Sequence, residues 1–164
     1  MHSIPRIIVA GTHSGCGKTT LASGLMAALT ARGLVVQPFK VGPDYIDPMH
    51  HSAICGRTSR NLDPFMMEEE GVRETFFRAS IGADIAIVEG AMGLYDGLEG
   101  GDIASTAHVA KILDAPVLLV VDAGGASRSV HAIVKGYSEF DPDIRVRGVI
   151  FNRIGSPRHR AIIE

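Results

Sequence analysis

Short, almost purely aliphatic runs recur along the chain and predict strands. They cover residues 6–10, 35–40, 85–89, 117–122 and 146–152. Most of these runs are rich in β-branched residues and show no alternation with polar positions, which is typical of strands buried on both faces. The pattern therefore predicts a mostly parallel sheet with helices on both faces.

Helical periodicity occupies the segments between these runs. Leu21, Leu25 and Leu29 lie four positions apart in residues 18–32, so one apolar stripe follows the predicted helix until Gly33 ends it. Further helices are predicted at 66–80, 105–113 and 127–140, and a last one from residue 156. Alternating strands and helices predict an α/β fold, in which the loops after the strands share one edge of the sheet. Ligands bind at that edge in open α/β sheets.

Residues 41–63 interrupt the alternation. The segment has no sustained periodicity, and three of its first eight residues are proline or glycine. Structureless loops longer than about 12–15 residues are uncommon in compact domains unless they are functional. We therefore expect an irregular functional loop here, and we do not expect the adjacent His50 and His51 to share a metal ion.

Composition narrows the possible functions. The chain has 164 residues, 46% of them hydrophobic, which suffices for one domain with a substantial core. Its formal net charge of -2 argues against a broadly basic surface, so we expect no nucleic-acid partner. Two cysteines provide neither a disulfide framework nor a metal-binding spacing, and no apolar run approaches the roughly 20 residues of a membrane helix. We expect a cytoplasmic protein that does not span a membrane.

A phosphate-binding loop is predicted at residues 11–20, GTHSGCGKTT, because this segment follows the first strand and opens the first helix. Glycines there let consecutive backbone N–H groups converge on phosphate oxygens, and the helix N-terminus favours an anion. Lys18 is expected to reach the terminal phosphates and Thr19 to coordinate Mg²⁺. Five residues, rather than the usual four, separate Gly11 from Gly17. The predicted nucleotide-binding residues are Thr12, Ser14, Gly15, Cys16, Gly17, Lys18, Thr19 and Thr20.

Carboxylates at the predicted ligand edge are candidates for metal binding and catalysis. Glu89 and Asp122 both end strands, and a P-loop enzyme needs one such carboxylate to organise Mg²⁺. We favour Glu89, because a glycine-rich loop follows it, and expect Asp122 to be structural. Asp44 and Asp47, beside Lys40, could hold a second metal or orient a substrate. Aspartate near proline is also common in turns, so spacing alone leaves both interpretations open.

Six motifs together resemble a known enzyme family. They are GTHSGCGKTT, KVGPDYIDP, NLDPFM, VEGAMGLYDG, STAHVAKILDAPVLLVVDA and GVIFNRIGSPRH. The combination resembles the amino-terminal ATP-binding domain of the cobyrinic acid a,c-diamide synthases, whose relatives include the nickel-sirohydrochlorin a,c-diamide synthases of methanogens. The phosphate loop, with its five-residue spacing, also resembles that of dethiobiotin synthetase. The resemblance covers essentially all 164 residues and implies a P-loop NTPase fold of the dethiobiotin synthetase type.

The resemblance implies an ATP-dependent amidation of the a and c carboxylates of a tetrapyrrole. ATP would phosphorylate a carboxylate, and ammonia would then displace the phosphate. Carried over by motif, the implied catalytic residues are Lys18, Lys40, Asp44, Asp47, Glu89 and Asp96, and the implied Mg²⁺ ligands are Thr19, Asp44 and Glu89. The implied substrate contacts are Tyr45, Ile46, Gly90 and Met92, and Asn152 would recognise adenine.

Full-length members of that family also have a carboxy-terminal glutaminase domain, which releases ammonia from glutamine. Neither Cys16 nor Cys55 has the sequence context of a glutaminase nucleophile, and the chain stops shortly after its last helix begins at Ser156. We therefore expect residues 1–164 to be a truncated synthetase domain without its glutaminase. The family also leads us to expect a homodimer.

Three alternatives stay open. The substrate could be nickel-sirohydrochlorin, because the same ATP and amidation motifs would serve both tetrapyrroles. A partitioning or septum-positioning ATPase switch usually has a signature lysine early in its phosphate loop, where this chain has His13, and lacks KVGPDYIDP. Dethiobiotin synthetase itself is disfavoured by NLDPFM and MGLYDG.

Overall fold

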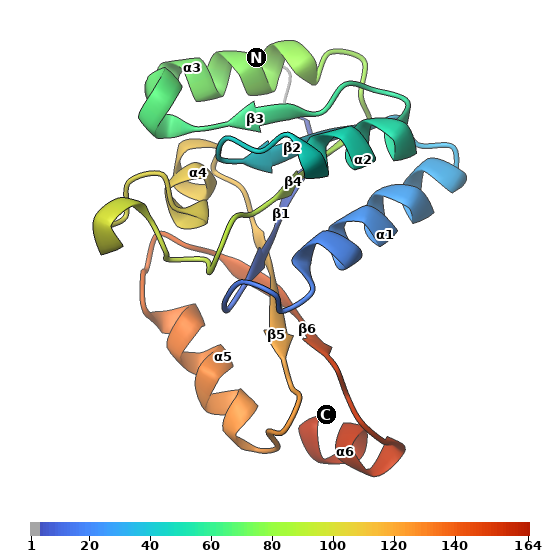
Figure 1. Ribbon diagram of the computed structural model, residues 1–164, viewed down its shortest axis with the longest axis vertical. Helices are drawn as coiled ribbons and strands as arrows, with labels where there is room; N and C mark the ends of the chain where they lie inside the picture. The colour runs from blue at the N-terminus through green and yellow to red at the C-terminus, as the bar shows by residue number, and fades with distance from the viewer. Residues whose placement is uncertain (1–3) are drawn as a thin grey trace.

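The computed structural model describes residues 4–164, whose strands form one six-stranded sheet (Figure 1). The strands are β1 (Arg6–Gly11), β2 (Val36–Val41), β3 (Arg60–Leu62), β4 (Ile85–Glu89), β5 (Val117–Asp122) and β6 (Val146–Asn152). Their order is β3-β2-β4-β1-β5-β6, and every neighbouring pair is parallel. The α/β class and the parallel sheet predicted from the aliphatic runs are confirmed.

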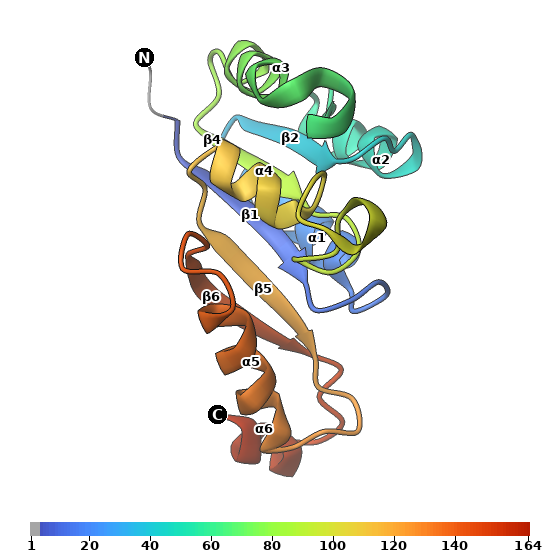
Figure 2. The same ribbon diagram turned by 90° about the vertical axis from the view of Figure 1, so that its left-hand side faces the viewer.

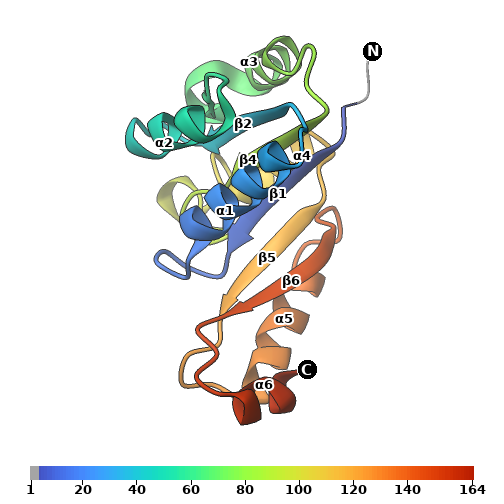
Figure 3. The ribbon, with the colours of Figure 1, turned by 90° about the vertical axis from the view of Figure 1, so that its right-hand side faces the viewer.

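Helices cover both faces of this sheet. They are α1 (Lys18–Ala31), α2 (Ile46–Cys55), α3 (Pro64–Ala79), α4 (Thr106–Ile112), α5 (Ser129–Glu139) and α6 (Pro157–Ile163), with a short 3₁₀ turn η1 (Leu98–Gly100). One face carries α1 and α2 (Figure 3), and the other carries α3, α4 and α5 (Figure 2). Within residues 4–164, no helix is long and apolar enough to cross a membrane.

The central strand β1 shows why the strand runs are aliphatic throughout. Ile8 and Ala10 are buried in the core beneath α3, α4 and α5, whereas Val9 is buried in the core beneath α1. Successive side chains of a strand point to opposite faces, so a strand covered on both sides needs apolar residues at consecutive positions.

The side chain of the N-cap residue itself begins α3, α4 and α6. Asp63 accepts hydrogen bonds from the backbone N–H groups of Phe65 and Met66 at the start of α3, and Ser105 accepts one from His108 at the start of α4. Ser156 caps α6, and Pro157 stands at its first position, as the sequence predicted. These caps satisfy N–H groups that lack a partner within the helix.

The prediction of an irregular loop over residues 41–63 is wrong, because the segment contains α2 and β3. The side chain of Asp44 accepts hydrogen bonds from the backbone N–H groups of Ile46 and Asp47, at 2.8 and 3.2 Å, and Pro48 lies in the first turn, where its missing N–H costs little. Only His51 is fully buried on α2, so the helix has no aliphatic stripe to produce a periodic pattern.

Candidate nucleotide and metal site

The phosphate loop lies between β1 and the first turn of α1, beside a pocket of about 420 Å³. Gly17 precedes the helix with a φ of 105°, a conformation that favours glycine. Cys16 is fully buried in the core beneath α1, and Lys18 donates a hydrogen bond to the carbonyl of His13 at 3.1 Å. The pocket is lined by Ser14, Gly15, Gly17, Lys18, Thr19, Thr20, Lys40, Glu89, Met92 and Arg153.

Two residues at the end of β6 bond to the backbone of this loop. The Asn152 amide donates to the carbonyl of Cys16 at 2.9 Å, and the Arg153 guanidinium donates to the carbonyl of Gly15 at 2.7 Å. Arg153 also forms an ion pair with Asp122, which accepts from the backbone N–H of Gly124. Asn152 was a candidate from the sequence, whereas Arg153 was not.

Tyr137 of α5 supports the same loop from its other side. Its hydroxyl donates to the carbonyl of Thr12 at 2.5 Å, and its own carbonyl accepts from the Tyr95 hydroxyl at 2.6 Å. Burial, together with the nearby Asp141, raises the pKa of Tyr95 to about 12, so this phenol remains a hydrogen-bond donor at neutral pH. Sequence reasoning missed both tyrosines, because only the packing of α5 brings Tyr137 to the loop and next to Tyr95.

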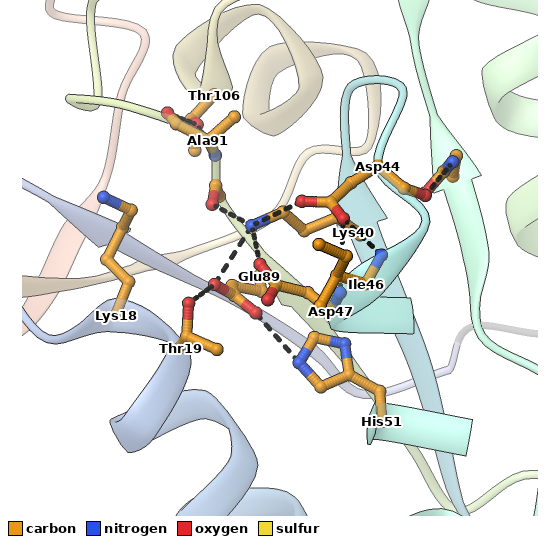
Figure 4. Close-up of polar contacts among 12 residues, drawn as sticks. Lys18, Thr19, Lys40, Asp44, Ile46, Asp47, His51, Glu89, Ala91 and Thr106 are labelled. Atoms are coloured by element: carbon orange, nitrogen blue, oxygen red, sulfur yellow. Dashed lines mark hydrogen bonds and ion pairs between the residues drawn. The ribbon is translucent and has the colours of Figure 1, made fainter. Parts of the chain in front are cut away.

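Lys40, at the end of β2, lies at the centre of an acidic cluster (Figure 4). Its ammonium group lies 3.0 Å from Glu89, 2.8 Å from Asp47 and 4.0 Å from Asp44, and it donates to the carbonyl of Gly90 at 3.2 Å. Burial alone would lower the pKa of Lys40, but the negative charge of Glu89 and the bond to Asp47 outweigh it and raise this pKa. The lysine therefore stays charged among three carboxylates.

Glu89 is fully buried at the end of β4, and both of its oxygens have close partners. Oε1 accepts from the Thr19 hydroxyl at 2.5 Å and from Lys40 at 3.0 Å, while Oε2 lies 2.8 Å from Nε2 of His51. Burial alone would raise the pKa of Glu89, but His51 and Lys40, with Thr19, hold this pKa below its ordinary value. The sequence drew attention to His51 only as an unlikely partner of His50 in metal binding, and did not predict its contact with Glu89.

The contacts of Glu89 and Asp122 distinguish between the two candidate metal-binding carboxylates. Glu89 touches the hydroxyl of Thr19, whereas Asp122 is bonded to Gly124 and Arg153. Asp44 approaches this centre only through Lys40, because its Oδ1 caps α2. Residues 4–164 contain no group of three or more His, Cys, Asp or Glu side chains that could hold a metal by itself. Hydroxyl and carboxylate oxygens suit Mg²⁺, and phosphate oxygens commonly supply its remaining ligands.

The remaining candidates lie on the rim of the site. Tyr45 and Ile46 are 84% and 70% exposed at the start of α2, and Met92 is 49% exposed with a φ of 48°. Asp96 accepts a hydrogen bond from the backbone N–H of Gly93 at 2.8 Å and so shapes the loop after β4. Tyr45 and Ile46 thus form an exposed, partly apolar surface next to Asp44 and Asp47 in the chain, whereas Met92 lines the pocket beside the phosphate loop.

Residues 7–164 match the family model described as the CobQ/CobB/MinD/ParA nucleotide binding domain. The chain belongs to this family. The phosphate loop and the pocket described above lie within the matched range.

Curated relatives in this family are similar over nearly the whole chain. A cobyrinate a,c-diamide synthase of Syntrophotalea carbinolica is 58% identical over 158 residues, which is 96% of this chain and 34% of the relative. A hydrogenobyrinate a,c-diamide synthase of Streptomyces coelicolor is 56% identical over 163 residues, which is 99% of this chain and 34% of the relative. The chain thus spans about a third of the length of these relatives.

Solved structures with the same fold are more distant in sequence. The signal recognition particle receptor FtsY from Elizabethkingia anophelis has a TM-score of 0.67 and 19% identity, over 99% of this chain and 55% of that one. A cobyrinic acid a,c-diamide synthase from Mycobacterium smegmatis, with a bound ATP analog and magnesium, has a TM-score of 0.61 and 17% identity, over 98% of this chain and 78% of that one. At this level of identity they establish the fold alone, which confirms the predicted P-loop architecture.

Proposed function

We propose that this chain is the ATP-using domain of an a,c-diamide synthase, which converts two peripheral carboxylates of a tetrapyrrole into amides. The observation that carries the proposal is the shared contact of Thr19 and Lys40 with Glu89 beside the phosphate loop. The Thr19 hydroxyl lies 2.5 Å and the Lys40 ammonium 3.0 Å from Oε1 of Glu89. The names of the relatives with more than 50% identity support the same assignment.

ATP and Mg²⁺ are the proposed nucleotide and metal. The loop backbone and Lys18 would bind the phosphates, while Thr19 and Glu89 would hold Mg²⁺, which neutralises phosphate charge when bound. Burial lowers the pKa of Lys18, although the nearby Glu89 and Asp96 act in the opposite direction. Asn152, which bonds to the loop at the carbonyl of Cys16, is proposed to contact the base.

The proposed reaction has two balanced steps. A substrate carboxylate oxygen attacks the terminal phosphorus of ATP, so that a new P–O bond forms and the bond to ADP breaks. Ammonia then attacks the carbonyl carbon of the resulting acyl phosphate, phosphate leaves with the bonding electron pair, and the nitrogen loses a proton. Two anions must meet in the first step, and the buried cations Lys18 and Lys40 are proposed to reduce their repulsion.

Asp44 and Asp47 are proposed to position Lys40 and the substrate carboxylate. Asp47 bonds to Lys40 at 2.8 Å, whereas Asp44 lies 4.0 Å away and caps α2. The exposed Tyr45, Ile46 and Met92 would contact the macrocycle beside this centre.

Glutamine is proposed as the source of ammonia, through a glutaminase region in the part of the relatives that this chain does not span. The two cysteines of the chain are free, and Cys16 is buried in the phosphate loop, so neither is proposed as a nucleophile. Free thiols also support the proposal of a cytoplasmic enzyme. The homodimer stays a prediction.

The decisive test uses the full-length protein with Mg²⁺, ATP, and either glutamine or ammonium. Cobyrinate and nickel-sirohydrochlorin are supplied in parallel, and ADP and the mass of the tetrapyrrole are followed. We expect one ADP for each amide, and the preferred tetrapyrrole identifies the substrate. ATP turnover with no amide from either tetrapyrrole would contradict the synthase proposal and favour an ATPase switch.

Replacing Asp47 with Asn tests the proposed chemistry. The variant should lose about 100-fold in kcat, because Lys40 loses the charged partner that positions it, while ATP affinity changes little. Asp143→Asn, at an exposed position, is the matched control and should leave both constants unchanged. An unchanged kcat for D47N would remove Asp47 from the catalytic set.

A further inference from the structure

His51 is a fully buried polar side chain in contact with the proposed metal carboxylate (Figure 4). Its Nε2 lies 2.8 Å from Oε2 of Glu89. This distance is short enough for a hydrogen bond, but the two groups are not well aligned for one. Its Nδ1 has no hydrogen-bond partner among the described residues. Burying an unpaired ring nitrogen costs free energy that an apolar side chain of similar size would not. Within residues 4–164, Glu89 is the one charged side chain within ion-pair distance of the ring.

The two oxygens of Glu89 face different parts of the molecule. Oε1 meets Thr19 and Lys40 on the side of the phosphate loop, whereas Oε2 meets His51 on the side of α2. A contact at one carboxylate oxygen limits rotation of the whole group. With Oε2 held next to His51, Oε1 is the oxygen that faces Thr19 and Lys40.

The same face of α2 contacts the acidic cluster twice. Asp47 and His51 are four residues apart, so they lie one above the other on the helix, and they reach Lys40 and Glu89 respectively. The opposite, exposed side of α2 carries Met49, next to Tyr45 and Ile46 at its start. A displacement of α2 by a bound substrate would therefore act on both Lys40 and Glu89.

We propose that His51 is a positioning residue, which orients the Glu89 carboxylate for the metal and connects the substrate-facing helix α2 to the metal site. The inference rests on the proposed function, because it assumes that Thr19 and Glu89 hold the metal. Residues that hydrogen-bond to a metal-binding side chain commonly contribute about 10- to 100-fold to metal affinity.

The test compares three replacements of His51 in the full-length protein. Gln can place an amide N–H near the position of Nε2, Asn is too short to do so, and Phe fills the space of the ring without a donor. The measured quantity is the affinity for Mn²⁺ in the presence of a non-hydrolysable ATP analog, followed by electron paramagnetic resonance. Thermal unfolding of each variant shows that it is folded, and His50→Gln, at the exposed neighbouring position, is the matched control.

We expect H51N and H51F to weaken Mn²⁺ binding by about 10- to 100-fold, with H51Q close to the wild type and H50Q unchanged. The affinity for the nucleotide without metal should be similar in all variants. A purely structural role would instead rank the variants by side-chain volume, with Phe the mildest change, and that ranking would overturn the proposal. Equal Mn²⁺ affinity in all variants would overturn it as well.

Substrate turnover separates this inference from the proposed function. If H51N and H51F show the Mn²⁺ defect but the wild type amidates neither tetrapyrrole, the positioning role stands and the synthase proposal fails. If the wild type amidates a tetrapyrrole and H51N and H51F bind Mn²⁺ normally, only the positioning role fails.

Discussion

Charged residues flank the phosphate loop on two sides, and the two groups differ in burial. On the β2 and β4 side, Glu89 is fully buried and the Lys40 side chain is only 7% exposed. On the β5 and β6 side, the Asp122 side chain is 16% exposed and that of Arg153 is 56% exposed. Both groups pair an acid with a base at strand ends beside the same loop.

Burial gives the two pairs different physical properties. Water and salt screen an exposed pair, which contributes about 1 kcal/mol or less to stability. A buried pair costs much desolvation free energy to form, and removing one partner leaves an uncompensated charge. Removing one partner should therefore cost much more stability on the β4 side than on the β6 side.

Lys40→Met should produce the largest effect, because it leaves Glu89 and Asp47 without their shared cation. We expect a loss of about 3–5 kcal/mol in the free energy of unfolding, measured with urea. Lys135→Met, at an exposed position of α5, should change stability by less than about 0.5 kcal/mol. A loss below about 1 kcal/mol for K40M would show that the two sides do not differ as burial implies.

Gly17→Ala should be the next largest change, because Gly17 lies between the two sides. A Cβ at this position would lie 2.3 Å from the Asn152 amide nitrogen, and a φ of 105° is strained for alanine. We expect a loss of about 1–3 kcal/mol in stability, with weaker ATP binding, by urea unfolding and calorimetry. Gly136→Ala is the control, and it should raise stability instead of lowering it. Gly136 is exposed within α5, no atom lies within 4 Å of where a Cβ would be, and alanine favours a helix more than glycine does. Equal effects of G17A and G136A would contradict the strain argument.

Arg153→Ala should cost little stability, since water screens its ion pair with Asp122. Its loss also frees the carbonyl of Gly15, so we expect weaker ATP binding with little change in the unfolding temperature. Both quantities can be measured on one sample by calorimetry and thermal unfolding. A destabilisation as large as that of K40M would refute the contrast between the two sides.

Asp122→Asn should give the smallest effect and one that depends on pH. The backbone N–H of Gly124, together with Arg153, holds the pKa of Asp122 below its ordinary value of about 3.9. The charged form therefore stabilises the fold above that value, and this stabilisation is lost as the pH falls through the lower, folded-state pKa. Urea unfolding should show D122N less stable than the wild type at pH 7, with the difference fading below about pH 4. A difference that grows as the pH falls would contradict this assignment.

The strands and the phosphate loop were predictable because their signals are local. Aliphatic runs mark β1, β4 and β5, and a lysine and two threonines after a glycine-rich turn mark the start of α1. The helix α2 was missed because its buried face carries His51 instead of leucines. The cap at Asp44 and the proline in the first turn were the local signals that could have revealed it.

By itself, the sequence determined the α/β class, the parallel sheet, the phosphate loop and the set of candidate carboxylates, since each depends on residue type and short-range spacing. Only the tertiary structure decided that Glu89 rather than Asp122 meets Thr19, that Lys40 lies among three carboxylates, and that His51 contacts Glu89. The physical reason is that these contacts join separate strands and helices. Their distances depend on strand order and on how α2 packs, which no local pattern of residues records.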